Sequence, residues 1–240
     1  MQTTEHGWTI IDAAAGVLSY AYEFTTDVSA NTVTARLASG GLLVLSPPID
    51  ASRAVADDLA AYGPVEAIVS NNGFHHLGIA RWRELFPQAR CFAAPGAAAR
   101  IARKSKNAGD LEPLHALTPL LADGVALLEA PDSKCGETWA RVETDDGCIW
   151  YGSDIFANLE QLPPNFVVRL LFKWTKSAPG YRLFNFAQKF TFKDRNGALR
   201  AVLEDVRAHP PTVMVPAHGA ILSGDSLAAK TEAMLVAATS

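Results

Sequence analysis

Four side chains that commonly bind metal ions each lie just after a short apolar run of this 240-residue sequence. They are His75, His76, Asp154 and His218. Three imidazoles and one carboxylate suit zinc, and they also suit iron or manganese where the site is less tetrahedral. The pattern therefore predicts a site for one divalent metal ion, with zinc favoured and iron or manganese as alternatives.

The adjacent pair His75-His76 restricts the local backbone. Neighbouring side chains diverge by roughly 100° on a helix and point to opposite faces on a strand, so two adjacent imidazoles converge only from an irregular loop. The polar stretch 70–78 supplies such a loop. The alternative is that these residues are structural, because a lone histidine is often a hydrogen-bonded core residue and an aspartate after a strand often caps a turn or helix. No metal would then be bound.

The first half of the chain alternates between two kinds of expected element. Runs rich in β-branched and aromatic residues predict strands at 8–11, 17–24, 32–37, 42–45, 65–69 and 90–94. Apolar residues at helical spacing predict helices at 52–62, 79–86 and 95–103. Gly40-Gly41 indicates a hairpin turn. The later alternation of helix and strand predicts parallel crossover units.

The second half contains further expected strands at 125–130, 138–144, 148–151 and 212–215, and a final helix at 226–237. The four candidate ligands therefore follow three separate strands. In layered α/β folds, binding sites gather where strands end and loops converge. We expect these ligands to meet at one edge of a sheet.

Composition restricts the class of protein. The chain has 49% hydrophobic and 19% charged residues, which is typical of a globular protein, and we expect one domain over 1–240. A net charge of -4 gives no electrostatic footprint for nucleic acid. No apolar run reaches the length of a transmembrane segment, and residues 1–6 lack the pattern of a signal peptide. A soluble, cytoplasmic protein is expected.

Two smaller features carry less information. The three cysteines contain no C-x-x-C pair, so neither a disulfide framework nor a zinc ribbon is indicated. The basic residues between 100 and 106 are expected to form a solvated helix face, with an anion site as the alternative.

The order of the segments resembles the metallo-β-lactamase superfamily. In that family a T-H-x-H-x-D-H-x-G loop follows a strand, and a P-G-H segment, a G-D pair and a terminal G-H come later. The counterparts here are the ranges 70–78, 131–133, 152–154 and 217–219. The resemblance extends from about Thr32 to the C-terminus. It implies an α/β fold, specifically a four-layer αββα sandwich with mixed sheets and a site at one sheet edge.

The resemblance also implies that one of the family's two metal sites is dismantled. Asn71 and Gly73 occupy the positions of the first two family histidines, and Ser133 occupies that of the histidine in the middle segment. Asn71 and Ser133 would then line the vacated pocket. There Asn71 could donate to a developing oxyanion, and Ser133 could contact a polar substrate.

The other family site is retained in a changed form. His75 stands in place of an aspartate, while His76, Asp154 and His218 match the neighbouring histidine, the bridging aspartate and the last histidine. The resemblance thus implies one metal with three nitrogen ligands and one oxygen ligand. Four protein ligands would close a tetrahedral ion, so catalysis would require five-coordination or release of His75.

A narrower resemblance is to an uncharacterised branch of the superfamily with a P-N-x-x-H-H loop, an F-P-x-A segment and a Pro-Gly pair. The ranges 71–76, 86–89 and 95–96 match this pattern. The branch has no assigned activity to carry over.

A basic amphipathic segment lies between Asp154 and His218. Residues 166–176 place Arg169, Lys173 and Lys176 against a wide apolar surface, within an expected helical cover at about 160–195. We expect this helix to pack across the sandwich with a solvated basic stripe. The alternatives are a lid over the site, a contact between the subunits of a homodimer, and a membrane-surface helix.

The sequence favours a divergent metal-dependent hydrolase that acts on a small ester, amide or lactone. The alternative is a non-catalytic relative that uses the degenerate pocket to bind a small ligand or a partner. An iron oxidoreductase at the same residues is a third hypothesis.

Overall fold

A computed structural model describes residues 1–25, 28–162 and 164–240. Its largest sheet has eight strands that pair in chain order, antiparallel from β1 to β5 and parallel from β5 to β8. The strands are β1 (Gln2–Thr3), β2 (Thr9–Asp12), β3 (Val17–Thr25), β4 (Val28–Arg36), β5 (Leu42–Leu45), β6 (Val65–Ser70), β7 (Arg90–Ala93) and β8 (Glu112–Pro113). The parallel half confirms the predicted crossover units.

A second sheet has five strands in the order β16-β14-β11-β10-β9. They are β9 (Val125–Glu129), β10 (Thr138–Thr144), β11 (Gly147–Tyr151), β14 (Pro211–Val215) and β16 (Leu222–Ser223). A third, small sheet contains β12 (Phe156–Leu159), β13 (Gly180–Leu183) and β15 (His218–Gly219). The third sheet was not expected from the sequence, because its strands are short and pair only through the tertiary fold.

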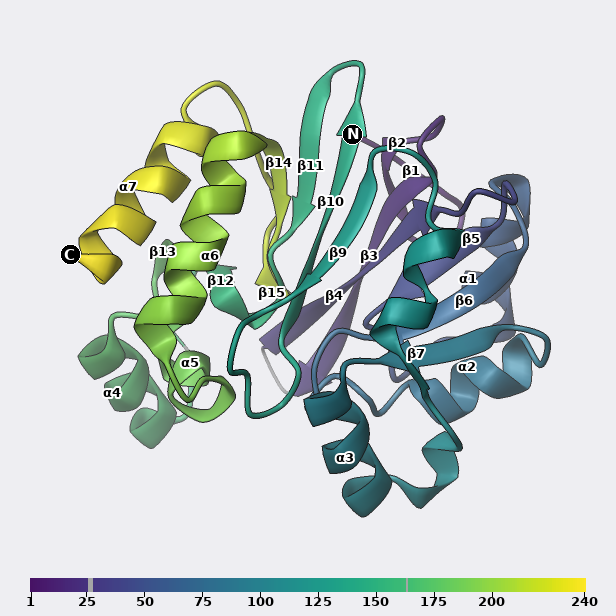
Figure 1. Ribbon diagram of the computed structural model, residues 1–240, viewed down its shortest axis with the longest axis horizontal. Coiled ribbons are helices and arrows are strands. Elements are labelled where there is room, and N and C mark those ends of the chain that lie inside the picture. Colours follow the sequence, from purple (N-terminus) through teal and green to yellow (C-terminus); the bar gives the residue numbers. More distant parts are fainter. Residues whose placement is uncertain (26–27, 163) are drawn as a thin grey trace.

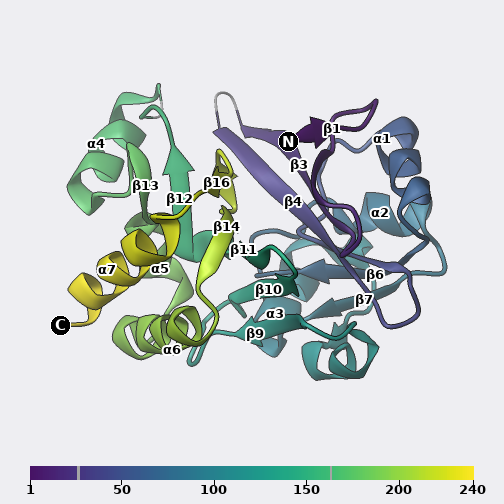
Figure 2. The same ribbon diagram turned by 90° about the horizontal axis from the view of Figure 1, so that it is seen from above.

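Helices cover the outer faces of the two large sheets (Figures 1 and 2). The helices are α1 (Arg53–Asp57), α2 (Ile79–Leu85), α3 (Pro95–Lys104), α4 (Phe166–Thr175), α5 (Asn185–Thr191), α6 (Arg195–Ala208) and α7 (Leu227–Thr239). Short 3₁₀ helices span Asp58–Ala61, Lys106–Ala108, Leu114–Ala116, Thr118–Leu120 and Ser153–Ile155. No helix in the described ranges is long and apolar enough to span a membrane.

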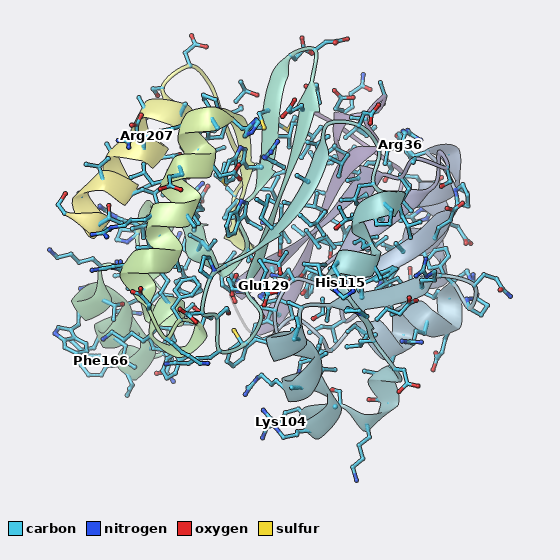
Figure 3. The ribbon with its side chains drawn as sticks, viewed as in Figure 1. Arg36, Lys104, His115, Glu129, Phe166 and Arg207 are labelled. Atoms are coloured by element: carbon cyan, nitrogen blue, oxygen red, sulfur yellow. The ribbon has the colours of Figure 1, made fainter. Side chains whose placement is uncertain are left out.

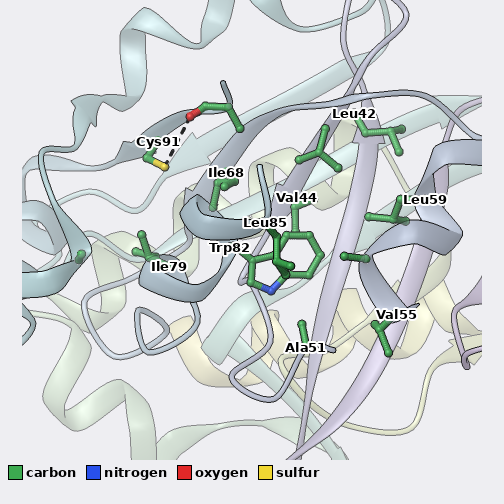
Figure 4. Close-up of a cluster of buried hydrophobic side chains, with 14 of the residues drawn as sticks. Leu42, Val44, Ala51, Val55, Leu59, Ile68, Ile79, Trp82, Leu85 and Cys91 are labelled. Atoms are coloured by element: carbon green, nitrogen blue, oxygen red, sulfur yellow. Dashed lines mark hydrogen bonds between the residues drawn. The ribbon is translucent and has the colours of Figure 1, made fainter. Parts of the chain in front are cut away.

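Three apolar cores join these layers. The first packs α1, α2 and α3 on the eight-stranded sheet around Trp8 and Trp82, and Figure 4 shows part of it. The second lies between the two large sheets and includes Leu43, Val69 and Tyr151. The third packs α6 and α7 on the five-stranded sheet. This layering confirms the predicted four-layer αββα sandwich.

Helix α6 is absent from the expected elements, although its signal is present in the sequence. Its buried residues recur at helical spacing: Ala198, Leu199, Val202, Leu203 and Val206. The side chain of Asp194 caps its first turn by accepting a hydrogen bond from the backbone N–H of Gly197. Most of the other boundaries were predicted to within two residues.

The sheets bring the candidate ligands together. β6 and β11 both end in polar loops, and β14 runs into the segment that contains His218. β11 and β14 are parallel neighbours, so their ends lie at the same edge of the five-stranded sheet. Asn31 on β4 then joins the eight-stranded sheet to the segment between β14 and β15, because its backbone N–H donates to the carbonyl oxygen of Ala217 over 2.8 Å.

Candidate metal centre

The loop that carries His75 is held in place by short side chains. The Ser70 hydroxyl lies 2.7 Å from the carbonyl oxygen of Asn72 and 2.8 Å from that of His75. In return, the Asn72 side-chain oxygen accepts the backbone N–H groups of Phe74 and His75. These contacts replace the strand ladder where β6 ends, and they fix the direction of the His75 side chain.

Backbone contacts also fix the turn that carries His218. The Asn31 amide donates to the carbonyl oxygens of Pro216 and Gly219, over 2.8 Å each. Gly219 has φ +95°, and a Cβ there would lie 1.9 Å from the carbonyl oxygen of Asn158. Only glycine fits this close approach to β12. The close approach of Gly219 to β12 therefore fixes the backbone next to His218.

Three of the four predicted ligands converge. The Nε2 atoms of His75 and His218 lie 3.2 Å and 3.3 Å from the same Asp154 oxygen, Oδ1. One potential ligand atom from each residue lies within 4.8 Å of the others. The side chains of His75, Asp154 and His218 are only 6%, 7% and 10% exposed. The three groups form an enclosed His-Asp-His cluster.

The far side of each group in this cluster has its own partner. Nδ1 of His75 lies 2.9 Å from the Ser46 hydroxyl, and Nδ1 of His218 donates to the carbonyl oxygen of Ser29 over 2.8 Å. The second Asp154 oxygen accepts a 3.0 Å hydrogen bond from the Asn72 amide. Outer contacts of this kind orient histidine and carboxylate ligands in metal sites.

The cluster shifts the acidity of its members. Burial raises the pKa of Asp154, but the charges of His75 and His218 and their hydrogen bonds outweigh it, so the pKa lies well below its usual range. Burial lowers the pKa of His218, and its bond to Asp154 outweighs this effect and raises the pKa. Asp154 is therefore ionised at neutral pH, as a metal ligand must be.

A buried glutamic acid accepts a hydrogen bond from the backbone of Asp154. The Glu137 carboxyl is fully buried, accepts the backbone N–H of Asp154 over 2.9 Å, and accepts the Asn72 amide over 3.0 Å. Burial, with the nearby charge of Asp154, raises its pKa well above the usual range. The Asn72 amide therefore bridges two carboxyl groups with opposite pKa shifts.

The structure places His76 outside the cluster. Its Nδ1 lies 2.9 Å from the hydroxyl of Ser105, at the end of α3. Burial and the charge of Arg100 lower its pKa. Among the described residues, the group that could hold a metal comprises His75, Asp154 and His218 without His76.

The residues at the positions where the sequence predicts a dismantled site are bonded to the protein itself. The Asn71 amide donates to the Ser153 hydroxyl. The Ser133 hydroxyl accepts the backbone N–H of Glu137 over 2.8 Å and lies 3.2 Å from the carbonyl oxygen of Thr191, so it stabilises a turn. The Ser133 hydroxyl is therefore fully engaged, whereas the Asn71 amide oxygen has no hydrogen-bond partner.

Arg100 covers the third of these positions. It lies over the Phe74 ring, 4.0 Å from its centroid, and its Nε donates to the carbonyl oxygen of Gly73 over 3.1 Å. A Cβ at Gly73 would lie 2.6 Å from Arg100 Cδ. The expectation that 100–106 is a solvated basic face is therefore wrong for Arg100, although Arg103 and Lys104 are exposed.

A cavity of about 650 Å³ lies next to His218. Its lining includes Ser29, whose carbonyl oxygen accepts the His218 hydrogen bond, and Gly219, which follows His218. Glu160 and Arg169 add one charge of each sign to the wall. This volume is in the range of small-molecule sites.

Solved structures of metallo-β-lactamases are similar to this chain. The chain aligns with FIM-1 metallo-β-lactamase from Pseudomonas aeruginosa in its mono-zinc form, with a TM-score of 0.55, 13% identity and coverage of 97% of this chain and 95% of that chain. It aligns with the DIM-1 metallo-β-lactamase at a TM-score of 0.57 and 12% identity, with coverage of 96% and 97%. These likenesses confirm the fold.

A different class of protein matches equally well. A fragment of a diflavin flavoprotein from Nostoc sp. PCC 7120 aligns with a TM-score of 0.55 and 16% identity, covering 93% of this chain and 92% of that one. No protein-family model matches the chain, and no curated protein matches it. The comparisons therefore establish the metallo-β-lactamase fold, which is shared by proteins with different activities.

Proposed function

We propose that this chain, which has the metallo-β-lactamase fold, binds one divalent metal ion and uses it to hydrolyse a small ester, amide or lactone. The ligands are His75, Asp154 and His218. The observation that carries the proposal is that both Nε2 atoms point at one Asp154 oxygen while separate partners hold the far side of all three groups.

The donor set fits a catalytic ion. Two imidazoles and one carboxylate are the ligands of several zinc and non-haem iron sites, and manganese accepts them as well. Three protein ligands leave a coordination position open, whereas the four ligands expected from the sequence would close a tetrahedral ion. A divalent ion supplies Lewis acidity there, which activates water near neutral pH and polarises a substrate carbonyl. Zinc is favoured.

Hydrogen bonds from the surrounding residues orient the three ligands. The carbonyl oxygen of Ser29 accepts a hydrogen bond from Nδ1 of His218, which keeps the proton on Nδ1 and leaves Nε2 for a metal. Ser46 orients His75 in a similar way. The Asn72 amide holds one Asp154 oxygen and leaves the other directed at the two imidazoles.

Asn71 is suited to contact the substrate. Its side chain is fully buried, and its amide oxygen has no hydrogen-bond partner. If the amide is turned over, the nitrogen becomes the unpaired atom, so one end of the amide is free in either orientation. In the turned orientation the free nitrogen is a donor beside Ser153, and such a donor can stabilise negative charge on a reacting carbonyl oxygen. The cavity next to Gly219 is lined by Ser29 and by none of the three ligands, so it adjoins the cluster on the Nδ1 side of His218.

The test is a hydrolysis assay on protein loaded with zinc, manganese or iron, using a panel of small esters, amides and lactones. We expect turnover that falls by at least about 100-fold in His218→Ala. His76→Ala is the matched control and should keep most of the activity, because His76 lies outside the cluster. Metal-loaded protein without turnover on any class would contradict the hydrolase proposal, and so would equal losses in the two variants.

A second candidate is a non-catalytic protein that binds a small ligand. The observation that favours it is the filling of the dismantled site by Arg100 and by the bond between Asn71 and Ser153. This candidate predicts ligand-dependent stabilisation without turnover. A thermal-shift screen on the metal-loaded protein, followed by the same hydrolysis assay with each hit, separates the two functions.

A further inference from the structure

The charge of the molecule is unevenly distributed along the chain. The whole protein has net charge -4, but residues 164–193 contain no aspartate or glutamate. This range carries six basic residues, namely Arg169, Lys173, Lys176, Arg182, Lys189 and Lys193. It includes α4, β13 and α5, which pack together at one end of the fold (Figure 1). An acidic protein therefore has one basic end.

Helix α4 exposes large apolar side chains at this basic end. Phe166, Leu170 and Trp174 are 74%, 58% and 72% exposed, and Val167 is 63% exposed. Their spacing of four residues places Phe166, Leu170 and Trp174 in one stripe along the helix. We call these four residues the α4 stripe. Figure 3 shows Phe166 at the outer edge of the molecule.

The opposite side of α4 anchors the helix to the protein. Phe172 is buried and packs against the rings of Phe184 and Phe186, with centroids 5.5 Å and 5.2 Å away. The Asn165 side chain caps the first turn. The sequence predicted that this helix packs across the sandwich, but Phe172 packs in a separate cluster at one end of the fold and the α4 stripe is exposed.

The α5 helix extends the exposed surface. Phe190 is 55% exposed, and the Lys189 ammonium lies over the Trp174 ring, 4.1 Å from its centroid. Lys173 is exposed on α4, and Lys176 follows it. Aromatic and aliphatic side chains bordered by lysines are typical of helices that lie in the headgroup region of a bilayer. With ten residues, α4 is about 15 Å long, too short to span a bilayer.

We propose that the α4 stripe attaches the protein to the surface of an anionic lipid bilayer. A negatively charged headgroup layer matches the six basic residues of 164–193, a range whose nearest carboxylates in the sequence are Glu160 and Asp194 at its borders, and the lipid chains can accept the exposed rings. A second copy of the chain matches poorly, because a symmetric contact through this end would bring two sets of basic residues together. The proposal does not depend on metal binding or hydrolysis.

The fluorescence of Trp174 is a direct probe of whether the α4 stripe inserts into a bilayer. The other four tryptophans, Trp8, Trp82, Trp139 and Trp150, are each at most 2% exposed. Exposed indole emission should therefore come from Trp174. We expect a blue shift and quenching by brominated lipid when the full-length protein meets phosphatidylglycerol-containing vesicles, and both signals should be lost in Trp174→Phe. Emission that stays unshifted on those vesicles would contradict insertion of the α4 stripe.

Vesicle flotation tests whether the α4 stripe and the lysines beside it bind anionic lipid. Binding to mixed phosphatidylcholine–phosphatidylglycerol vesicles should exceed binding to pure phosphatidylcholine by about 10-fold and should weaken with salt. The double variants Phe166→Ser/Leu170→Ser and Lys173→Glu/Lys189→Glu should both reduce it by about 10-fold. The matched control Val236→Ser/Lys230→Glu changes exposed residues of α7 and should bind like the wild type.

Three further outcomes overturn the proposal. The first is no binding to anionic vesicles, and the second is binding that the Phe166→Ser/Leu170→Ser variant retains in full. The third is a dimer in gel filtration that this variant dissociates while vesicles bind neither protein, which would make the surface a contact between subunits. Circular dichroism of each variant confirms that the fold is intact before either result is interpreted.

Discussion

Two sets of residues lie near the same strand ends, and their polar side-chain atoms are directed differently. In the His-Asp-His cluster, both imidazoles direct Nε2 at one Asp154 oxygen. At the positions of the dismantled site, Asn71 and Ser133 use polar atoms on the protein itself, and Arg100 covers Gly73. One set converges on a point and the other is closed by internal bonds.

The difference is between side chains that are directed at one atom and side chains that are mostly bonded to the surrounding protein, with one Asn71 amide atom left unpartnered. A missing ligand would leave backbone and side-chain groups without partners, which costs roughly 1–3 kcal/mol each. Ser133 prevents this by accepting the Glu137 backbone N–H. The retained cluster instead concentrates its donors and acceptors on the space between the two imidazoles.

The largest effect is expected for Asp154→Asn. The change removes the charge that both imidazoles face and the ligand that lies between them. Zinc affinity measured by competition with a chelating dye should fall by more than about 100-fold, beyond the roughly 10–100-fold loss typical of outer partners. An affinity within a few-fold of the wild type would mean that the metal binds elsewhere.

Ser46→Ala and Ser133→Ala compare the two sets directly. Ser46 orients His75, so its loss should weaken zinc binding by about 10–100-fold. Ser133 stabilises a turn, so its loss should lower the free energy of unfolding by about 1–2 kcal/mol and leave the zinc affinity unchanged. Isothermal titration and urea unfolding measure the two quantities. The comparison fails if Ser133→Ala weakens zinc binding as much as Ser46→Ala does.

Gly73→Ala tests whether Arg100 fills the dismantled site. The new Cβ would lie 2.6 Å from Arg100 Cδ, so the variant should lose about 1–2 kcal/mol of unfolding free energy. In an Arg100→Ala background most of that cost should disappear, because the Cδ atom at 2.6 Å and the Cγ atom at 3.2 Å are gone and only Cβ at 3.0 Å remains. A double-mutant cycle in urea measures the coupling. Equal costs in both backgrounds would show that Arg100 does not restrict this position.

The smallest effect concerns an exposed histidine–aspartate pair far from the cluster. His6 Nδ1 lies 2.7 Å from an Asp58 oxygen, and this hydrogen bond raises the pKa of His6. Its contribution to stability is present below about pH 6.5 and is lost as the pH rises through the raised value. The difference in Tm between wild type and His6→Ala should therefore be small at pH 5.5 and near zero at pH 8.5. A difference that grows with pH would contradict this sign.

The fold was largely predictable because its signals are local. Strand β5 is a continuous apolar run and helices α2 and α3 have apolar residues at helical spacing, and a short window contains each of these signals. β12, β13 and β15 were missed because their sequences, FANL, GYRL and HG, contain neither a β-branched residue nor a continuous apolar run. Helix α6 was missed despite its helical spacing, so that error was avoidable.

The site was predictable only in part. Strand ends located His75, Asp154 and His218, but the choice between His75 and His76 depends on bonds within the loop from Ser70 and Asn72. Ser46 and Glu137 were missed. A signal existed for both, since Ser46 directly follows a strand and Glu137 directly precedes one that runs antiparallel to β11. Their pairing with the ligands required the tertiary structure.

The central claim is that the His-Asp-His cluster is a site for one metal. The most direct test is the metal content of the full-length protein, purified without chelator and again after supplementation with zinc, iron and manganese, by mass spectrometry. We predict about one equivalent of a single metal, and its loss in Asp154→Asn. Less than about one-tenth equivalent in all preparations, or an unchanged content in Asp154→Asn, would contradict it.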